Sequence, residues 1–180
     1  QYPWKGILGG DGMEVQIDNR NPNIVFTGSQ FGFYARLDLE TGKRKSIKPI
    51  HELGNSPYRF NWQTPILLSP HNQDVLYLGS NFLHKSSNQG DDWQTISEDL
   101  TSGGKKGNVP YGTITTISES PVKEGVLYTG SDDGLVYVSK NSGKTWKNIS
   151  GNLPKELWVS NVYASNHDEK VVYLSLDGYR

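Results

Sequence analysis

The chain is a succession of short runs in which apolar residues alternate with polar ones or stand together, and Gly, Pro, Asn, Asp and Ser bound almost every run. Such runs are typical of β-strands, whereas the 3.6-residue spacing of amphipathic helices is almost absent. The pattern therefore predicts an all-β protein. The expected strands are 13–17, 24–28, 33–39, 44–48, 65–69, 75–79, 82–86, 93–97, 113–119, 126–130, 135–139, 145–149, 159–164 and 171–175.

One strand-sized segment recurs along the chain. Val75-Leu76-Tyr77-Leu78-Gly79-Ser80 is repeated 51 residues later as Val126-Leu127-Tyr128-Thr129-Gly130-Ser131, and Ile24-Val25-Phe26-Thr27-Gly28-Ser29 lies 51 residues earlier. A shorter copy, Val171-Val172-Tyr173-Leu174-Ser175, follows after a step of 45 residues. Repeats of about 50 residues made of strand-sized pieces predict a β-propeller whose blades have four antiparallel strands.

The repeat divides the chain into three blades and half of a fourth. We expect the blades at about 9–50, 61–100 and 110–150, with an incomplete one at 157–180. Since a closed ring needs about four blades or more, the chain is expected to be part of a larger propeller. The last two strands would then end on an open blade surface, which we expect the rest of the propeller or another protein chain to cover.

Two copies of an eight-residue motif follow the third strand of the second and third blades. Both have the spacing Ser-x-Asn-x-Gly-x-x-Trp. This spacing suits a hairpin turn in which Asn bonds nearby backbone amides, Gly adopts a positive φ, and Trp packs back on the blade. We therefore expect structural roles for Ser86, Asn88, Gly90, Trp93, Ser139, Asn141, Gly143 and Trp146.

The motif resembles the Asp box, or bacterial neuraminidase repeat, with Asn in the Asp position. Together with the repeat it makes the chain similar to Asp-box propellers of the sortilin type and of xyloglucanase-type glycoside hydrolases. Large secreted bacterial sortilin-like proteins are most similar, on Gly9-Gly10-Asp11-Gly12 and on residues 59–65, 69–71 and 174–180. The resemblance implies a propeller fold and export, to the periplasm, the cell surface or the medium.

The resemblance to the xyloglucanase type also marks one catalytic position. In that type an aspartate lies in a Thr-Asp-x-Gly-Gly turn after the second strand of an early blade, and the matching stretch here, 27–33, has Gln30 instead. Because glutamine cannot act as a general acid or base, the prediction leans away from an enzyme. The alternative is a glycoside hydrolase that cleaves β-glucans with carboxylates partly outside this segment.

The long connections between blades are the best candidates for ligand binding, because they exceed what a hairpin needs and re-enter near the central channel. The repeat steps make Asp11, Trp62, Thr113 and Trp158 equivalent positions at the blade entrances. Indoles and an acid there suit sugar stacking or a clamp on a peptide. The candidate ligand-binding residues are Asp11, Arg59, Asn61, Trp62, Tyr111, Asp132 and Trp158.

Each of these candidates also has a structural interpretation. The two Trp side chains could wedge adjacent blades together, and Asp11 could cap a glycine turn. Asp132 stands in an Asp-Asp-Gly sequence, which is a strong hairpin-turn signal. Arg59 could bind a ligand carboxylate or pair with an acid of a nearby loop.

Composition excludes several classes of function. With 18 basic against 19 acidic residues and no basic block, the chain has little electrostatic basis for binding nucleic acid. The absence of Cys excludes disulfide scaffolds and thiolate chemistry, and the four His show no metal-ligand spacing. No apolar run is long enough to span a membrane. We therefore predict no metal or cofactor, and a recognition or scaffold module for protein, peptide or glycan.

Overall fold

The computed structural model describes residues 4–178, which contain fourteen strands and no helix. The strands form four antiparallel sheets, three with four strands in chain order and one with two. Sheets of this kind that follow one another in space are the blades of a β-propeller. The strands are β1 Val15–Ile17, β2 Ile24–Ser29, β3 Phe33–Asp38, β4 Arg44–Ser46, β5 Ile66–Leu68, β6 Leu76–Gly79, β7 Leu83–Ser86, β8 Gln94–Thr95, β9 Ile114–Glu119, β10 Leu127–Ser131, β11 Val136–Ser139, β12 Lys147–Asn148, β13 Trp158–Ala164 and β14 Val172–Asp177.

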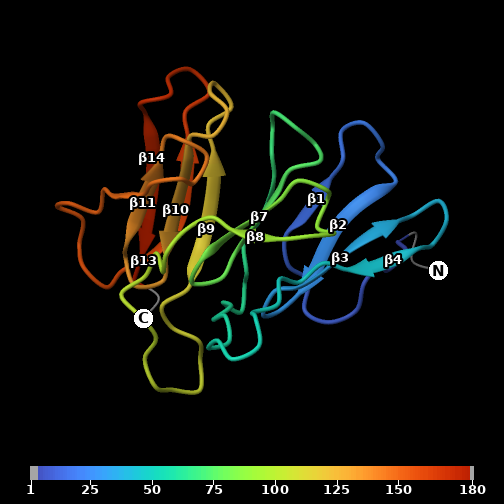
Figure 1. Ribbon diagram of the computed structural model, residues 1–180, viewed down its shortest axis with the longest axis horizontal. Helices are drawn as coiled ribbons and strands as arrows, with labels where there is room; N and C mark the ends of the chain where they lie inside the picture. The colour runs from blue at the N-terminus through green and yellow to red at the C-terminus, as the bar shows by residue number, and fades with distance from the viewer. Residues whose placement is uncertain (1–3, 179–180) are drawn as a thin grey trace.

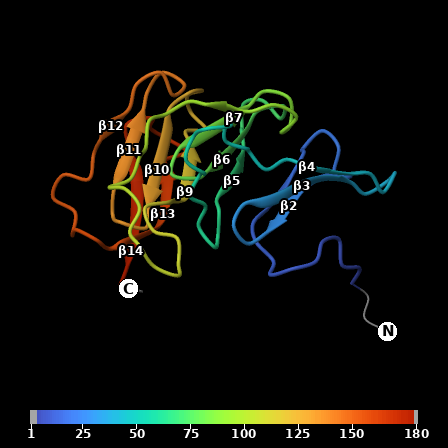
Figure 2. The same cartoon turned by 60° about the horizontal axis from the view of Figure 1, so that its bottom comes forward.

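The blades succeed one another across the molecule, from β1–β4 at one end to β13–β14 at the other (Figures 1 and 2). Every strand expected from the sequence is present in the expected order. The expected outer strands 93–97 and 145–149 are shorter in the structure, with two exposed residues each. The end of the motif at 174–180 is described only in part, since Tyr179 and Arg180 lie outside the described residues.

An apolar core lies between each pair of consecutive blades. Since side chains alternate along a strand, one face of the second blade packs on the first blade and the other face on the third. Ile66 and Leu68 of β5 pack on Phe26 and Tyr34 of the first blade. On the opposite face, Tyr77 belongs to the core shared with the third blade. Each fully buried large side chain contributes about 1.5–3 kcal/mol, so the blades are held mainly by these interfaces.

The two Ser-x-Asn-x-Gly-x-x-Trp turns have the same hydrogen bonds. In the second blade the Ser86 hydroxyl oxygen accepts from the amides of Gly90 (2.8 Å) and Asn88 (3.2 Å), and the hydroxyl donates to Asn88 Oδ1 (2.9 Å). In the third blade the Ser139 hydroxyl makes the equivalent bonds with Asn141 and Gly143. Gly90 and Gly143 have φ of 87° and 85°, in the left-handed region that favours glycine. The expected turn chemistry is therefore present in both blades.

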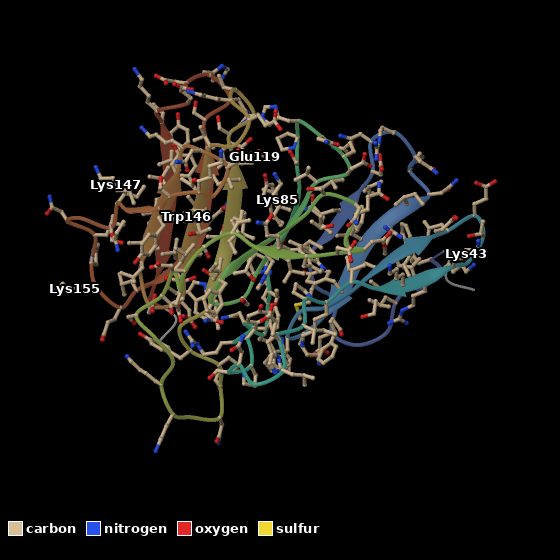
Figure 3. All side chains as sticks on the ribbon, viewed as in Figure 1. Lys43, Lys85, Glu119, Trp146, Lys147 and Lys155 are labelled. Carbon is tan, nitrogen blue, oxygen red and sulfur yellow. The ribbon has the colours of Figure 1, made fainter. Side chains whose placement is uncertain are left out.

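The tryptophan of each turn packs on the core that its own blade shares with the preceding blade, and its indole N–H reaches that preceding blade. The indole N–H of Trp93 donates to the carbonyl of Ile47 (2.8 Å), and that of Trp146 donates to the carbonyl of Ile96 (2.9 Å). Trp146 directly precedes β12, and both Trp146 and Lys147 of β12 are labelled in Figure 3. The acceptors follow the outermost strand of the preceding blade, which has no strand beyond it to pair with. The turn thereby joins neighbouring blades at the rim.

In residues 4–178, no helix is present that is long and apolar enough to cross a membrane.

Candidate functional site

A cavity of about 1020 Å³ opens where the first strands of the blades converge. Residues of all four blades line it, because the innermost strands β1, β5, β9 and β13 all border the propeller axis. We call it the axial cavity. Its lining includes Glu14, Asn61, Trp62, Thr116, Trp158 and Asp177.

The axial cavity brings together two of the aromatic residues predicted from the sequence. Trp62 is 48% exposed, and its ring meets that of Phe31 edge to face with the centroids 5.1 Å apart. The Trp62 carbonyl also accepts the amide of Phe31 (3.2 Å), so the two residues are joined through their backbones as well as through their rings. Trp158 is half-buried at the start of β13. Both indoles line the same cavity from equivalent blade entrances.

At the other two equivalent positions, Asp11 and Thr113, the side chain does not line the axial cavity. Thr113 is fully buried, and its hydroxyl accepts from Asn61 Nδ2 (2.8 Å) and donates to Asp132 (3.0 Å). Asp11 is exposed, does not line the axial cavity, and accepts from Gln30 Nε2 at 3.4 Å. Equivalence in the repeat therefore fixes where the backbone lies, while the side chain decides whether the position faces the cavity.

Asp132 lies inside the third blade rather than on the axial cavity. Its carboxylate is fully buried and accepts from the amides of Gly112 and Thr113, both at 2.9 Å. Two amide donors and a hydroxyl fix a buried carboxylate in place and compensate its lost hydration. These contacts agree with the turn interpretation of Asp132.

Arg59 and Tyr111 likewise lie off the cavity lining. The Arg59 guanidinium forms an ion pair with Asp99 (2.7 Å) and donates to the carbonyl of Gly112 (3.0 Å). The ring of Tyr111 lies under the ammonium group of Lys105, which is 4.1 Å from the ring centroid. Arg59 thus pairs with a loop acid, as the structural interpretation expected, and ties the entrance of the second blade to that of the third.

Asn61 is the polar candidate that does reach the cavity. It is buried, donates to Thr113, and accepts the amide of Gln63 (3.1 Å) through Oδ1. These bonds hold the segment that carries Trp62. Asn61 therefore positions the Trp62 backbone while it forms part of the cavity wall.

Glu14 is a cavity residue that the sequence reasoning missed. Its carboxylate accepts the amide of Ile66 (3.2 Å) in the next blade, and burial raises the pKa of this carboxyl above its ordinary value. The repeat could have found it, because two 51-residue steps align Glu14 with Thr116, whose hydroxyl accepts the amide of Val162 at 3.2 Å. The position serves as an acceptor for the next blade in both cases.

The charge of the axial cavity has one sign. Among residues 4–178, its lining contains two carboxylates, of Glu14 and Asp177, and no Lys, Arg or His. Anionic ligands are therefore disfavoured, and neutral or cationic ones fit. Within residues 4–178, no three His, Asp or Glu side chains gather as metal ligands would.

No protein-family description matches the chain, and no curated protein does either. Among solved structures, an ancestral GH74 enzyme is 19% identical over 92% of this chain and 22% of its own, with a TM-score of 0.63. The extracellular domain of the one-component system BT4673 from B. thetaiotaomicron is 16% identical over 92% and 20%, with a TM-score of 0.60. YCF48 bound to D1 peptide is 15% identical over 77% and 39%, with a TM-score of 0.52.

These likenesses show the class of protein, which is a β-propeller. At such low identity they carry the fold and no activity. The chain spans between 20% and 39% of the length of the matched chains.

Proposed function

We propose that this chain belongs to a recognition module without catalytic activity, and that its axial cavity binds a neutral oligosaccharide. The observation that carries the proposal is the pair of indoles, Trp62 and Trp158, in one cavity of about 1020 Å³. This volume lies at the upper end of typical small-ligand sites. It has room for several sugar rings.

The composition of the wall supports a sugar. The apolar faces of pyranose rings stack on indoles, while their hydroxyl groups exchange hydrogen bonds with amides, hydroxyls and carboxylates. Asn61, Thr116 and Ser160 offer such groups beside the two indoles. Because the described residues of the wall include carboxylates and no Lys, Arg or His, a neutral glycan fits better than a uronic acid or a sulfated one.

The same geometry gives little support to hydrolysis. A glycoside hydrolase needs two carboxyl groups across the scissile bond. Asp11 does not line the cavity, Asp132 is fully buried in its turn, and Gln30 stands at the xyloglucanase-type position. The lining does contain the carboxylates of Glu14 and Asp177, but that of Glu14 is bonded to the amide of Ile66 in the next blade. The proposal therefore favours recognition over cleavage.

Export from the cytoplasm is the second part of the proposal. Its support is the sequence resemblance to secreted propellers, together with a fold shared with an extracellular sensor domain. Proteolytic shaving of intact cells, with immunodetection of this segment in the cell-surface and periplasmic fractions, tests it. Detection in the cytoplasm alone would contradict it.

Binding is tested by titrating the chain with neutral oligosaccharides chosen from a glycan array. Trp62→Ala and Trp158→Ala are each expected to weaken binding at least tenfold, or about 1.4 kcal/mol. Trp4→Ala is the matched control, because Trp4 is 84% exposed and does not line the cavity. Equal affinity in all three variants would refute the axial site.

Two other results would assign the axial cavity a different ligand or an activity. Binding of peptides but not glycans, lost in the same two variants, would make the module a peptide receptor, a function suggested by YCF48 bound to D1 peptide. Release of reducing ends from β-glucans by the chain, abolished by Asp177→Asn, would restore the hydrolase alternative.

A further inference from the structure

The first and last sheets each have a face on which no blade packs within residues 4–178 (Figure 2). Each face can be compared with the same repeat positions in the interior blades. The comparison shows what such a face contacts when a neighbouring blade is present.

The face of β1 has the composition of a buried blade interface. Val15 and Ile17 are 49% and 51% exposed. The 51-residue step aligns them with Ile66 and Leu68, which are 2% and 7% exposed in the core between the first two blades. The same apolar positions are therefore half exposed in the first blade and buried in the second.

The face of β14 shows the complementary case. Tyr77 and Tyr128 are 2% and 3% exposed in the cores that face the following blade. Tyr173, at the equivalent position, is 61% exposed. Burying a tyrosine ring of this kind contributes a few kcal/mol, and the exposed Tyr173 does not make this contribution.

Hydrogen bonds from backbone amides to side chains add a second, directional feature at two of the three interior interfaces. The amides of Ile66 and Leu68 donate to the side chains of Glu14 (3.2 Å) and Gln16 (3.3 Å) in the preceding blade. The same pattern recurs between β9 and β13, where Val162 and Ala164 donate to Thr116 (3.2 Å) and Ser118 (3.0 Å). A polar side chain of one innermost strand thus accepts an amide of the next.

We propose that the face of β1 and β2 is an interaction surface for a further four-stranded propeller blade that precedes β1. That blade presents a Val-x-Tyr pair from its second strand, as Val75 and Tyr77 do, and polar acceptors from its first strand to the amides of Val15 and Ile17. The proposal continues interfaces that the chain already repeats between its own blades.

A whole blade fits this face better than a second copy of the chain. In the interior interfaces the third strand of the preceding blade also enters the core, through Leu83 of β7 and Val138 of β11. A second copy would offer the sheet β13–β14, which has no third strand within the described residues. Its Val171 and Tyr173 reproduce only part of the required surface.

The test supplies such a blade. A copy of residues 109–149, whose Val126, Tyr128 and Val138 receive β13 and β14 in this structure, is fused ahead of Gln1 of the full chain. Hydrogen exchange of the Val15 and Ile17 amides is then compared with that of the unextended chain. We expect exchange to slow at least tenfold, and expect Tyr128→Asp in the added copy alone to reverse most of the effect.

Several outcomes would overturn the proposal. Unchanged exchange at Val15 and Ile17 would do so, as would an added blade that stays unfolded while the rest of the chain keeps its native exchange pattern. Protection of Val15 together with Tyr173 in the unextended chain, rising with concentration, would assign the surface to a second copy instead.

Discussion

The Ser-x-Asn-x-Gly-x-x-Trp turn gives a sharp test of how the blades are stabilised, through Ser86→Ala. The hydroxyl of Ser86 is buried and takes part in three hydrogen bonds, accepting from Gly90 and Asn88 and donating to Asn88 Oδ1. Removing it leaves the amide of Gly90, a buried residue, without this acceptor. An unsatisfied buried donor costs about 1–3 kcal/mol, and each lost hydrogen bond about 1 kcal/mol net. We expect a total of about 2–3 kcal/mol.

The matched control is Ser87→Ala. Ser87 is the next residue and is exposed, so its replacement should change the free energy of unfolding by less than about 0.5 kcal/mol. Both variants make the same chemical change at adjacent positions, one buried and one exposed. The difference between them therefore isolates the hydrogen bonds of Ser86.

The assay is equilibrium unfolding in urea, followed by tryptophan fluorescence and by far-UV circular dichroism. Two probes are needed because Trp93, in the same turn, reports locally on the bond to Ile47. A loss of 2–3 kcal/mol corresponds to a Tm lower by about 5–10 °C for a chain of this size. If Ser86→Ala and Ser87→Ala agree within about 0.5 kcal/mol, the hydrogen bonds of Ser86 do not stabilise the blade.

Three further predictions use the same unfolding measurement. Gly143→Ala should lower the free energy of unfolding by about 2–4 kcal/mol, because φ is 85° and a Cβ would lie 2.7 Å from the Ile96 side chain of the preceding blade. Gly42→Ala, with φ of 72° and open space around the residue, should cost about 1 kcal/mol. Equal costs would contradict the packing argument. Burial lowers the pKa of His84 from 6.5 to about 4, so the unfolded chain binds a proton at a higher pH than the folded protein does. As the pH falls from 6.5 to 4, the free energy of unfolding should therefore decrease more than it does in His84→Gln. Parallel pH profiles of the two proteins would refute this. Ile66→Ala should lower the free energy of unfolding by about 3 kcal/mol and Val15→Ala by less than about 0.5 kcal/mol, since only Ile66 is buried by a neighbouring blade. Similar losses in the two variants would mean that the β1 face is already covered.

The strand order, the blade repeat and the two turns could all be predicted from the sequence, because they depend on local features. Side chains alternate along a strand whatever its neighbours are, and a Ser-x-Asn-x-Gly turn closes on its own backbone. The repeat also identified Trp62 and Trp158 as equivalent, and both line the axial cavity. Equivalent sequence positions in a repeat fold have equivalent backbone positions, which is the physical reason that both indoles stand at blade entrances.

Only the tertiary structure decided which side chains meet across blades. Nothing local to Trp93 indicates that its indole bonds Ile47 of the preceding blade, and nothing local to Arg59 selects Asp99 as its partner. The place of Glu14 in the cavity wall is also a tertiary feature, since it depends on how the second blade lies against the first. Such partners are set by the packing of whole sheets, which sums over many side chains distant in sequence. The sequence by itself therefore determined the blades, and the packing between them determined the cavity.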